Sequence, residues 1–326
     1  MSSATQLLHK LIPGTFVSGK VLAAELEVSS TTVQKIVQML MDRGVQIDRV
    51  RGRGYRLRHA LDLLRESDIL AQLDSNAEVR KIRFDCLSEV DSTNDYIKRY
   101  IPLGPNEVAA CTAEYQTAGR GRRGREWASP YASNVYLSLL WRMQRPISEA
   151  SALSAWICVR IAQLLQKCGV PGVRLKWPND VYIGQKKLAG ILLEGSGTID
   201  AGFDLIIGVG VNVSMSQQCS PNIDQAWTDI ISETSGWSYS RSELVGMLLG
   251  TLVQTLNDFE DGSLRELPQS WSAYDLAIGK QVQLLLANKT ILGKAMGVDE
   301  LGALCLERDG RIDQYTAGDL SLRLET

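Results

Sequence analysis

Histidine is scarce in this chain, and its scarcity excludes several kinds of catalytic centre. The two histidines, His9 and His59, lie in the first 60 residues, so the rest of the chain offers no Ser/His/Asp arrangement for nucleophilic catalysis. No C-x-x-C pair occurs, and no His/Cys spacing typical of a zinc site exists. The six cysteines are scattered at Cys86, Cys111, Cys158, Cys168, Cys219 and Cys305. Such thiols are typical of reduced cysteines in a cytosol, so we expect a cytoplasmic protein.

Long apolar runs are missing as well. No uninterrupted apolar stretch approaches the roughly 20 residues that a membrane-spanning helix needs. The first residues, Met1 to Thr5, show no charged start followed by an apolar segment, so no export signal is visible. With 326 residues, of which 44% are hydrophobic, the chain is expected to fold into two or three domains with packed cores.

The charge is distributed unevenly along the chain. Residues 1–60 contain nine Lys or Arg and four Asp or Glu, which gives a net charge of +5. The remaining residues contain 26 basic and 33 acidic side chains, which gives −7. A basic N-terminal module on an acidic body indicates nucleic-acid binding at one end only.

Residues 1–60 predict a winged helix-turn-helix domain. Apolar residues recur at helical spacing in three short segments, and Ser18 and Ser30 are suited to cap the second and third helices. Residues 45–57 alternate apolar and polar around Arg51-Gly52-Arg53-Gly54, which predicts a two-stranded wing. Helix, turn, helix and basic hairpin is the order of a winged helix-turn-helix.

The third helix and the wing carry the candidate DNA contacts. These are Ser30, Thr31, Thr32, Gln34 and Lys35 on the helix, and Arg51 and Arg53 on the wing. The first turn of the helix, where base-edge contacts are usually made, has no arginine. Wing arginines contact phosphates or the minor groove more readily than they read bases. The sequence leaves two interpretations open, a DNA-binding module and a small protein-docking module.

An arginine-rich loop, Gly119-Arg120-Gly121-Arg122-Arg123-Gly124-Arg125, follows a predicted strand in the central part. Three interpretations compete for it: a solvated basic loop, a dinucleotide-binding fingerprint, and a flap that closes over a phosphate. The fingerprint requires a helix to open at its third glycine. Here Pro130 and the strand-like residues 135–141 follow instead, so the fingerprint is excluded. Guanidinium groups on a glycine-rich backbone favour an anionic ligand.

Two further domains follow the basic module. Residues 61–278 predict an α/β domain, which starts with a linker helix placed within 61–80. Within it, Ser240 and Glu243 predict a capping box that opens a long helix. Residues 279–326 contain short strands separated by turn residues, which predict a small all-β barrel. On the apolar strand at 205–213, Gly208 and Gly210 point to the same face. Missing side chains on one face indicate either close approach of another group to the backbone or tight sheet packing.

Four polar clusters stand out in the central domain. They are Ser92-Thr93-Asn94, Gln116 to Trp127, Lys176-Trp177-Pro178-Asn179-Asp180, and Lys187, which we expect on a hairpin turn. The first suits an uncharged polar head group; the others supply cations, an aromatic plane and an acid able to hold Mg²⁺. Each cluster alone has an ordinary explanation as a solvated turn. Together they predict the nucleotide-dependent activation of a carboxylate.

Three of these stretches carry a resemblance to a known family. The arginine-glycine loop, Lys176-Trp177-Pro178-Asn179-Asp180 and Lys187-Leu188-Ala189-Gly190-Ile191-Leu192-Leu193-Glu194 resemble those of biotin–protein ligases. With the basic module in front, the chain resembles the bifunctional ligases that also repress the biotin operon. The resemblance implies an α+β chain with three parts. These are a winged helix-turn-helix, a ligase domain of the class II aminoacyl-tRNA synthetase/biotin–lipoate ligase type, and an SH3-like barrel.

The resemblance also implies an activity and its partners. Biotin and ATP, with Mg²⁺, would give biotinyl-5′-adenylate, and biotin would then pass to one lysine of the biotin carrier domain of acetyl-CoA carboxylase. The adenylate-bound form would be a homodimer that binds operator DNA. A lipoate-type ligase and a ligand-sensing regulator without catalysis are the alternatives.

The family's functional positions carry over residue by residue. Biotin-binding positions implied are Ser92, Thr93, Asn94, Gln116, Arg120, Gly121, Arg122, Lys187, Gly190, Gly208 and Gly210. Nucleotide-binding positions implied are Arg122, Arg125, Trp127, Lys176, Asn179, Asn212 and Arg323. Lys187, Arg122 and Asp180 are the implied catalytic residues, and Asp180 is the implied Mg²⁺ ligand.

Overall fold

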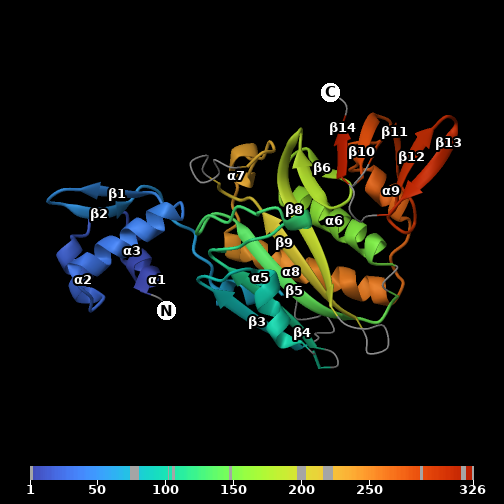
Figure 1. Ribbon diagram of the computed structural model, residues 1–326. Helices are drawn as coiled ribbons and strands as arrows, with labels where there is room; N and C mark the ends of the chain where they lie inside the picture. Colours follow the sequence, from blue (N-terminus) through green and yellow to red (C-terminus); the bar gives the residue numbers. More distant parts are fainter. Residues whose placement is uncertain are drawn as a thin grey trace.

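The computed structural model describes residues 3–73, 81–101, 103–104, 107–146, 149–196, 203–215, 223–286, 289–316 and 321–324. Figure 1 shows a small helical module with a hairpin at the N-terminal end, a central sheet flanked by helices, and a small β-structure at the C-terminal end. Cys219 and the last part of the predicted linker helix lie outside the described residues. The cysteines of the described ranges are free thiols. No helix in those ranges is long and apolar enough to cross a membrane.

The N-terminal module has the order expected of a winged helix-turn-helix. Its elements are α1 (Ser3–Leu11), α2 (Gly19–Glu25), α3 (Ser30–Asp42), β1 (Ile47–Val50) and β2 (Gly54–Leu57). Ser18 caps α2 as predicted, since its hydroxyl accepts from Val21 N at 3.2 Å. The predicted cap of α3 is wrong by one residue. Ser29 adopts the extended capping conformation and accepts from Thr32 N at 3.0 Å, so Ser30 is the first helical residue.

The wing is an antiparallel hairpin of β1 and β2 with a third short contact. Val17 forms an antiparallel bridge with Tyr55, which ties the start of the module to the wing. At Gly54, where φ is +104°, a Cβ atom would collide with the Val17 carbonyl. Glycine is therefore required where the wing turns back into β2.

The linker helix is shorter than the sequence predicts. Only α4 (Glu66–Leu70) is helical, whereas residues 61–65 have no regular structure. The physical reason is that their backbone donors have other partners. Leu64 N donates to Glu114 Oε1 at 2.6 Å, and Arg65 N donates to Ser242 Oγ at 2.9 Å. These contacts hold the linker against the central domain.

The central domain is a seven-stranded mixed sheet in the order β3-β4-β5-β9-β8-β7-β6. Its strands are β3 (Lys81–Leu87), β4 (Glu107–Ala113), β5 (Val135–Met143), β6 (Val173–Lys176), β7 (Asp180–Ile183), β8 (Lys186–Ser196) and β9 (Phe203–Val211). β3 and β4 are parallel, and the other neighbours are antiparallel. Figure 1 shows β8 and β9 in the middle of the domain.

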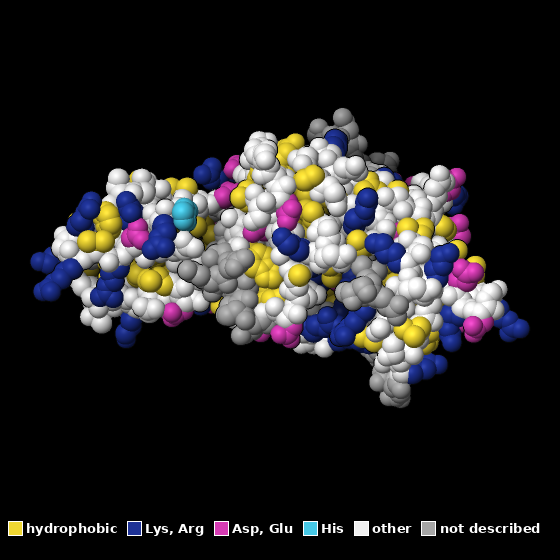
Figure 2. All heavy atoms as spheres, turned by 90° about the horizontal axis from the view of Figure 1, so that it is seen from above, with side chains coloured by type: hydrophobic (Ala, Val, Ile, Leu, Met, Phe, Trp, Pro, Cys, Tyr) yellow, Lys and Arg dark blue, Asp and Glu magenta, His cyan; other side chains and the backbone are white. Residues whose placement is uncertain are grey.

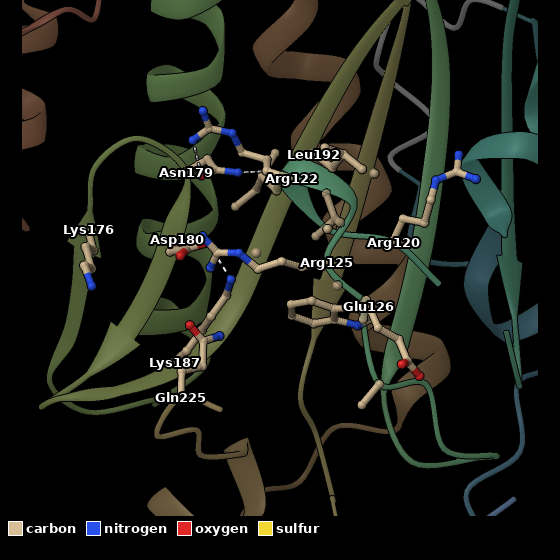
Figure 3. Close-up of a pocket in the computed structure, with 18 of the residues that line it drawn as sticks. Arg120, Arg122, Arg125, Glu126, Lys176, Asn179, Asp180, Lys187, Leu192 and Gln225 are labelled. Carbon is tan, nitrogen blue, oxygen red and sulfur yellow. Dashed lines mark hydrogen bonds and ion pairs between the residues drawn. The ribbon is translucent and has the colours of Figure 1, made fainter. Parts of the chain in front are cut away.

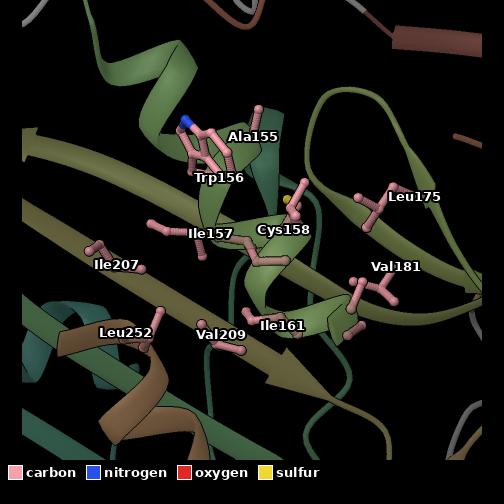
Figure 4. Close-up of a cluster of buried hydrophobic side chains, with 14 of the residues drawn as sticks. Ala155, Trp156, Ile157, Cys158, Ile161, Leu175, Val181, Ile207, Val209 and Leu252 are labelled. Carbon is pink, nitrogen blue, oxygen red and sulfur yellow. The ribbon is translucent and has the colours of Figure 1, made fainter. Parts of the chain in front are cut away.

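Both faces of this sheet are covered. On one face pack the long helices α6 (Ala150–Lys167) and α8 (Arg241–Glu260), and on the other α5 (Thr93–Ile97), followed by a 3₁₀ turn, η1 (Lys98–Tyr100). The predicted capping box, in which Ser240 and Glu243 pair, opens α8. Figure 4 shows part of the core that α6 and α8 form with the sheet. Its labelled residues are Ala155, Trp156, Ile157, Cys158 and Ile161 of α6, packed against Leu175, Val181, Ile207, Val209 and Leu252. Burial on both faces explains why the central strands are almost continuously apolar.

The C-terminal part is a five-stranded antiparallel sheet in the order β13-β12-β11-β10-β14, as the sequence predicts for an all-β domain. Its strands are β10 (Gln281–Leu285), β11 (Thr290–Val298), β12 (Leu304–Arg308), β13 (Arg311–Tyr315) and β14 (Ser321–Leu324). Two short helices, α7 (Ile230–Glu233) and α9 (Leu267–Ser272), lie in the connections before it. Trp177 Nε1 donates to the Gly302 carbonyl at 3.1 Å, so the two domains are held together beside the Lys176–Asp180 turn.

Candidate active site

A cavity of about 1370 Å³ lies where the arginine-glycine loop crosses the ends of the central strands. Its walls come from the start of α5, the loop itself, β7, β8 and β9, and from Leu322 and Arg323 of the C-terminal sheet. All four polar clusters identified in the sequence line it. Figure 3 shows Lys176, Asp180, Lys187, Arg122 and Arg125 gathered on one side of this cavity.

One end of the cavity is a hydrogen-bonded network of uncharged groups. Gln116 Oε1 accepts from both the backbone N (2.9 Å) and the hydroxyl (3.0 Å) of Thr93. Ser138 Oγ lies 2.7 Å from Thr93 Oγ1 and 2.6 Å from Asn94 Oδ1. Gln116 Nε2 in turn donates to Ser129 Oγ at 2.9 Å. These side chains are buried and fix one another, so they present a rigid polar surface to an uncharged head group.

The glycines of β8 and β9 make room for side chains of the site itself. A Cβ atom at Gly208 would collide with Asn94, and one at Gly210 would collide with the Trp127 ring. At Gly190 it would lie 3.2 Å from Lys187 Nζ and from Trp127. Of the two alternatives that the sequence leaves open for Gly208 and Gly210, close approach of another group is the one observed, and the groups are Asn94 and Trp127.

The arginine-glycine loop folds back on itself. Arg120 and Glu126 form an antiparallel bridge, and Gly121 N donates to the Arg125 carbonyl at 2.7 Å. Between them is a 3₁₀ turn, η2 (Arg122–Gly124), in which Arg123 has φ 60°. No helix opens here, which agrees with the exclusion of a dinucleotide fingerprint.

Two arginines of the loop have different partners. The Arg120 guanidinium pairs with both carboxylate oxygens of Asp95, at the start of α5. This contact, helped by Lys98, lowers the pKa of Asp95 to about 2. Arg122 donates instead to Asn179 Oδ1 at 3.2 Å, across the cavity. Figure 3 shows the Arg120 and Arg122 side chains extending in different directions. The loop thus spans the cavity from one polar wall to the other.

The other end of the cavity is strongly cationic. Lys187 Nζ lies 2.7 Å from Asp180 Oδ1, and it also lies 5.3 Å from the centre of the Trp127 ring. Lys176 lies 5.2 Å from the Tyr182 ring, and burial lowers the pKa of its amine. Arg125 and Arg323 also line this end. Seven Lys and Arg side chains line the cavity against three carboxylates, those of Glu126, Asp180 and Asp224. The excess of positive charge suits the phosphates of a nucleotide.

Lys187 is placed differently from the prediction. It was expected on a hairpin turn, but it is the second residue of β8, where its backbone pairs with Tyr182. A register shift between Val181 and Tyr182 accompanies this pairing. Its backbone N also donates to the Ala226 carbonyl at 3.0 Å. A strand position held on both sides fixes the lysine more firmly than a turn would.

The described side chains of the cavity do not form a magnesium site on their own. Within the described ranges no group of three or more His, Cys, Asp or Glu side chains could hold a metal ion. The Asp180 carboxylate, predicted as a Mg²⁺ ligand, is paired with Lys187. Mg²⁺ commonly binds through one or two carboxylates together with the phosphates of a substrate. Any magnesium would therefore have to be held largely by the nucleotide.

Asn212 lies outside this cavity. It was predicted on the nucleotide side, but it is absent from the cavity lining, and its side-chain amide donates to the Thr228 carbonyl at 3.0 Å. Three residues that matter to the site were not singled out in the sequence: Asp95, Ser138 and Glu194. Ser138 gave a signal, because it is a polar residue inside an otherwise apolar strand. Asp95 follows Ser92-Thr93-Asn94 directly, but nothing local indicates that it pairs with Arg120.

The candidate DNA-binding face lies on the N-terminal module. Thr31, Thr32, Gln34 and Lys35 of α3 are not buried, and neither are Arg51 and Arg53 of the wing. Arg53 lies over the Phe16 ring at 4.3 Å, whereas Arg56 and Arg58 pair with Asp48 at 2.7 and 3.0 Å. Figure 2 shows Lys and Arg side chains gathered over this module. The wing therefore offers Arg51 and Arg53 as basic groups without a carboxylate partner among the described residues.

Comparison with known proteins agrees with this geometry. The biotin/lipoate A/B protein ligase family matches residues 87–212, the biotin protein ligase C-terminal domain matches 277–323, and a helix-turn-helix domain matches 4–56. Together with these matches, the cation-rich loop and the polar cavity define the class of this protein as a biotin- or lipoate-type protein ligase. The chain belongs to the biotin/lipoate A/B protein ligase family.

The similarity extends over nearly the whole chain. The bifunctional ligase/repressor BirA of Escherichia coli (strain K12) is 38% identical over 98% of this chain and 96% of its own length. BirA of Bacillus subtilis (strain 168) is 29% identical over 94% of each chain. A solved structure of biotin protein ligase from Aquifex aeolicus, in complex with biotin and ATP, is 28% identical with a TM-score of 0.63. It covers 74% of this chain and 99% of its own.

Proposed function

We propose that this chain is an ATP-dependent biotin–protein ligase that also represses biotin-synthesis genes. The observation that supports ligase activity most strongly is the difference in polarity between the two ends of the cavity. Its uncharged end, with Thr93, Asn94 and Gln116, suits the ureido ring of biotin. Its cationic end, with Lys187 and Arg125, suits the carboxylate of biotin and the phosphates of ATP.

In the first half-reaction, a carboxylate oxygen of biotin attacks the α-phosphorus of ATP. A P–O bond forms, the bond to the β-phosphate oxygen breaks, and pyrophosphate leaves. Lys187 stabilises the negative charge that builds on the α-phosphate, because its ammonium is fixed on β8 by Asp180 and by the backbone. Magnesium, when bound with ATP, supplies further positive charge at the phosphates.

In the second half-reaction, the amine of a carrier lysine attacks the acyl carbon of the adenylate. An amide bond forms, AMP leaves with the electron pair of the acyl–oxygen bond, and the amine loses a proton. The same Lys187 would stabilise the negative charge of the leaving phosphate. The carrier is the biotin carrier domain of a biotin-dependent carboxylase such as acetyl-CoA carboxylase.

The arginine-glycine loop protects the intermediate. An acyl adenylate is a mixed anhydride that water would hydrolyse, so the enzyme must exclude water while it waits for the carrier. The loop is anchored at one wall through Arg120 and Asp95 and reaches the other wall through Arg122 and Asn179. Those two contacts place it across the cavity, where it can close over a ligand.

Repression uses the N-terminal module together with dimer formation. One winged helix is too weak for specific binding, since non-specific affinities lie around 10⁻⁴–10⁻⁶ M and operator binding generally needs two copies. We propose that the adenylate-bound form is a homodimer paired through β8. Short β7 pairs only with Lys186 to Gly190 of β8, so Leu192 to Ser196 have no strand on that side among the described residues. An open strand edge beside the ligand loop is suited to pair with a second copy.

The free thiols of the described residues fit a reducing compartment, so we propose that the protein is cytoplasmic. The ligase activity is tested by incubating the chain with biotin, Mg·ATP and a purified biotin carrier domain, then weighing the carrier. We expect the carrier to gain one biotinyl group, and a carrier whose target lysine is replaced to gain none. A parallel reaction contains lipoate in place of biotin. No modification with biotin, or modification in the lipoate reaction alone, would contradict the proposal.

A further inference from the structure

Glu194 does not line the cavity itself but contacts Asn94, which does, and none of the sequence motifs gave it a role. It lies on β8 with the same alternation as Gly190 and Leu192, which line the cavity, so its side chain projects from that face. Its carboxylate Oε2 accepts from Asn94 Nδ2 at 2.8 Å. Lys98 and Arg120 are more distant, at 3.8 Å each. The closest partner of Glu194 is therefore a ligand-facing amide, and the two cations are secondary.

This contact decides which way the Asn94 amide points. A carboxylate can only accept hydrogen bonds, so the Asn94 NH₂ group must face Glu194. The Asn94 oxygen then faces Ser138 Oγ, at 2.6 Å. The bare backbone at Gly208 lets the amide lie flat against β9, since a Cβ atom there would collide with it. Two opposed partners and one flat surface leave the amide a single orientation.

The orientation matters for a ligand with donors and an acceptor in fixed places. A cyclic urea has two N–H donors and one carbonyl acceptor, so a rotated amide would place a donor against a donor. A mismatched buried polar contact loses a hydrogen bond and leaves two groups desolvated. We propose that Glu194 is a positioning residue for the head-group end of the site, acting through Asn94. The inference rests on the proposed function, since it takes biotin as the ligand.

Two variants separate this role from simple charge pairing. Glu194→Gln keeps an oxygen that accepts from Asn94 but removes the charge that faces Arg120 and Lys98. Glu194→Ala removes both. Glu107→Ala is the matched control, because Glu107 is a strand carboxylate that pairs with Arg83 at 3.0 Å and Lys81 at 3.7 Å, away from the cavity.

The experiment measures biotin binding by calorimetry without ATP, and the steady-state constants for biotin and ATP with a carrier domain. We expect Glu194→Ala to weaken biotin binding and raise its KM about tenfold, the effect of one lost hydrogen bond, with kcat and the KM for ATP nearly unchanged. Glu194→Gln should restore wild-type biotin binding to within about threefold, and Glu107→Ala should match wild type.

Three results would overturn the inference. Equal impairment of Glu194→Gln and Glu194→Ala would assign the role to charge. A fall in kcat together with a rise in both KM values would assign it to structure. Unchanged biotin binding in Glu194→Ala would leave Asn94 oriented without Glu194. Failure of the proposed function is a separate result, in which the wild-type chain itself neither binds biotin nor labels a carrier; the positioning role then falls with it.

Discussion

Lys187 Nζ lies 2.7 Å from Asp180 Oδ1, with the lysine side chain 14% and the aspartate side chain 23% exposed. The lysine extends along β8 toward the first residue of β7, over the space that Gly190 leaves free. An ion pair on two hydrogen-bonded strands holds the ammonium in one place before any ligand arrives. Electrostatic stabilisation is most effective when the charge is already in position.

Replacing Lys187 should separate binding from chemistry. We expect Lys187→Ala to bind biotin almost as tightly as wild type, because the uncharged network around Thr93 and Gln116 remains. The adenylation rate should fall on the order of 10²–10³-fold, as for the loss of one transition-state charge contact. Calorimetry and a pyrophosphate-release assay measure the two quantities. Equal losses in affinity and rate would make Lys187 a ground-state binding residue.

Asp180 can be tested as the partner of Lys187 or as a metal ligand. If Asp180 mainly positions Lys187, Asp180→Asn should lower the adenylation rate about tenfold, and added Mg²⁺ should not restore it. A metal ligand would behave differently, since the variant would need more Mg²⁺ for half-maximal activity. The measurement is a Mg²⁺ titration of pyrophosphate release at saturating ATP. Rescue by high Mg²⁺ would favour the metal-ligand role.

Arg122 should help to retain the adenylate. It crosses the cavity to Asn179, so Arg122→Gly removes a contact that holds the loop across the cavity. We expect the adenylate to escape and acylate lysines of an unrelated protein in the same tube, which mass spectrometry would detect. Arg123→Gly is the control, because Arg123 has φ 60° and glycine accepts that conformation without strain. Bystander labelling no higher than wild type in the Arg122 variant would contradict this role.

The Asp95–Arg120 pair predicts a pH dependence. The pKa of Asp95 in the folded protein is about 2, below the ordinary value of 3.8. The stabilisation that the pair gives to the fold is therefore complete above about pH 4 and is lost as pH falls toward 2. Asp95→Asn should reduce the free energy of unfolding by about 1 kcal/mol at pH 7, because the pair is partly exposed. The difference from wild type should shrink between about pH 4 and pH 2. Urea unfolding at several pH values tests this, and a difference that stays constant with pH would contradict it.

Local signals in the sequence predicted much of the architecture. Ser18 and the Ser240–Glu243 pair cap helices as expected, because a cap depends on residues within one turn. The strand that carries Gly208 and Gly210 and the arginine-glycine loop also lie where the pattern placed them. These features are determined by neighbours in the chain, so they can be recognised without tertiary information.

Contacts between distant residues could not be predicted in this way. Asn94 and Glu194 meet because α5 packs on the face to which β8 contributes, and no local pattern records that. The linker was predicted as a longer helix from its apolar residues, but Glu114 and Ser242 take its backbone donors. Asn212 follows β9, yet whether its side chain faces the cavity depends on the position of Thr228.

We propose that one ligand, the adenylate, links the two ends of the molecule. A ligand that orders the β8 edge and its loop would reduce the entropy lost when a second copy binds, so it should favour the proposed dimer, on which we expect DNA binding to depend. Carrier domain consumes the adenylate and should reverse this effect. DNA binding should therefore respond to the supply of biotin and to the demand for it.

The most direct test is a gel shift at fixed salt on a two-fold symmetric site upstream of the cognate biotin-synthesis genes. We expect tight binding only when biotin and Mg·ATP are both present, and release of the DNA when carrier domain is added. Arg51→Ala with Arg53→Ala should weaken binding while leaving ligation unchanged. DNA binding that ignores the adenylate would contradict the coupling, and no binding at all would favour a protein-docking role for the N-terminal module.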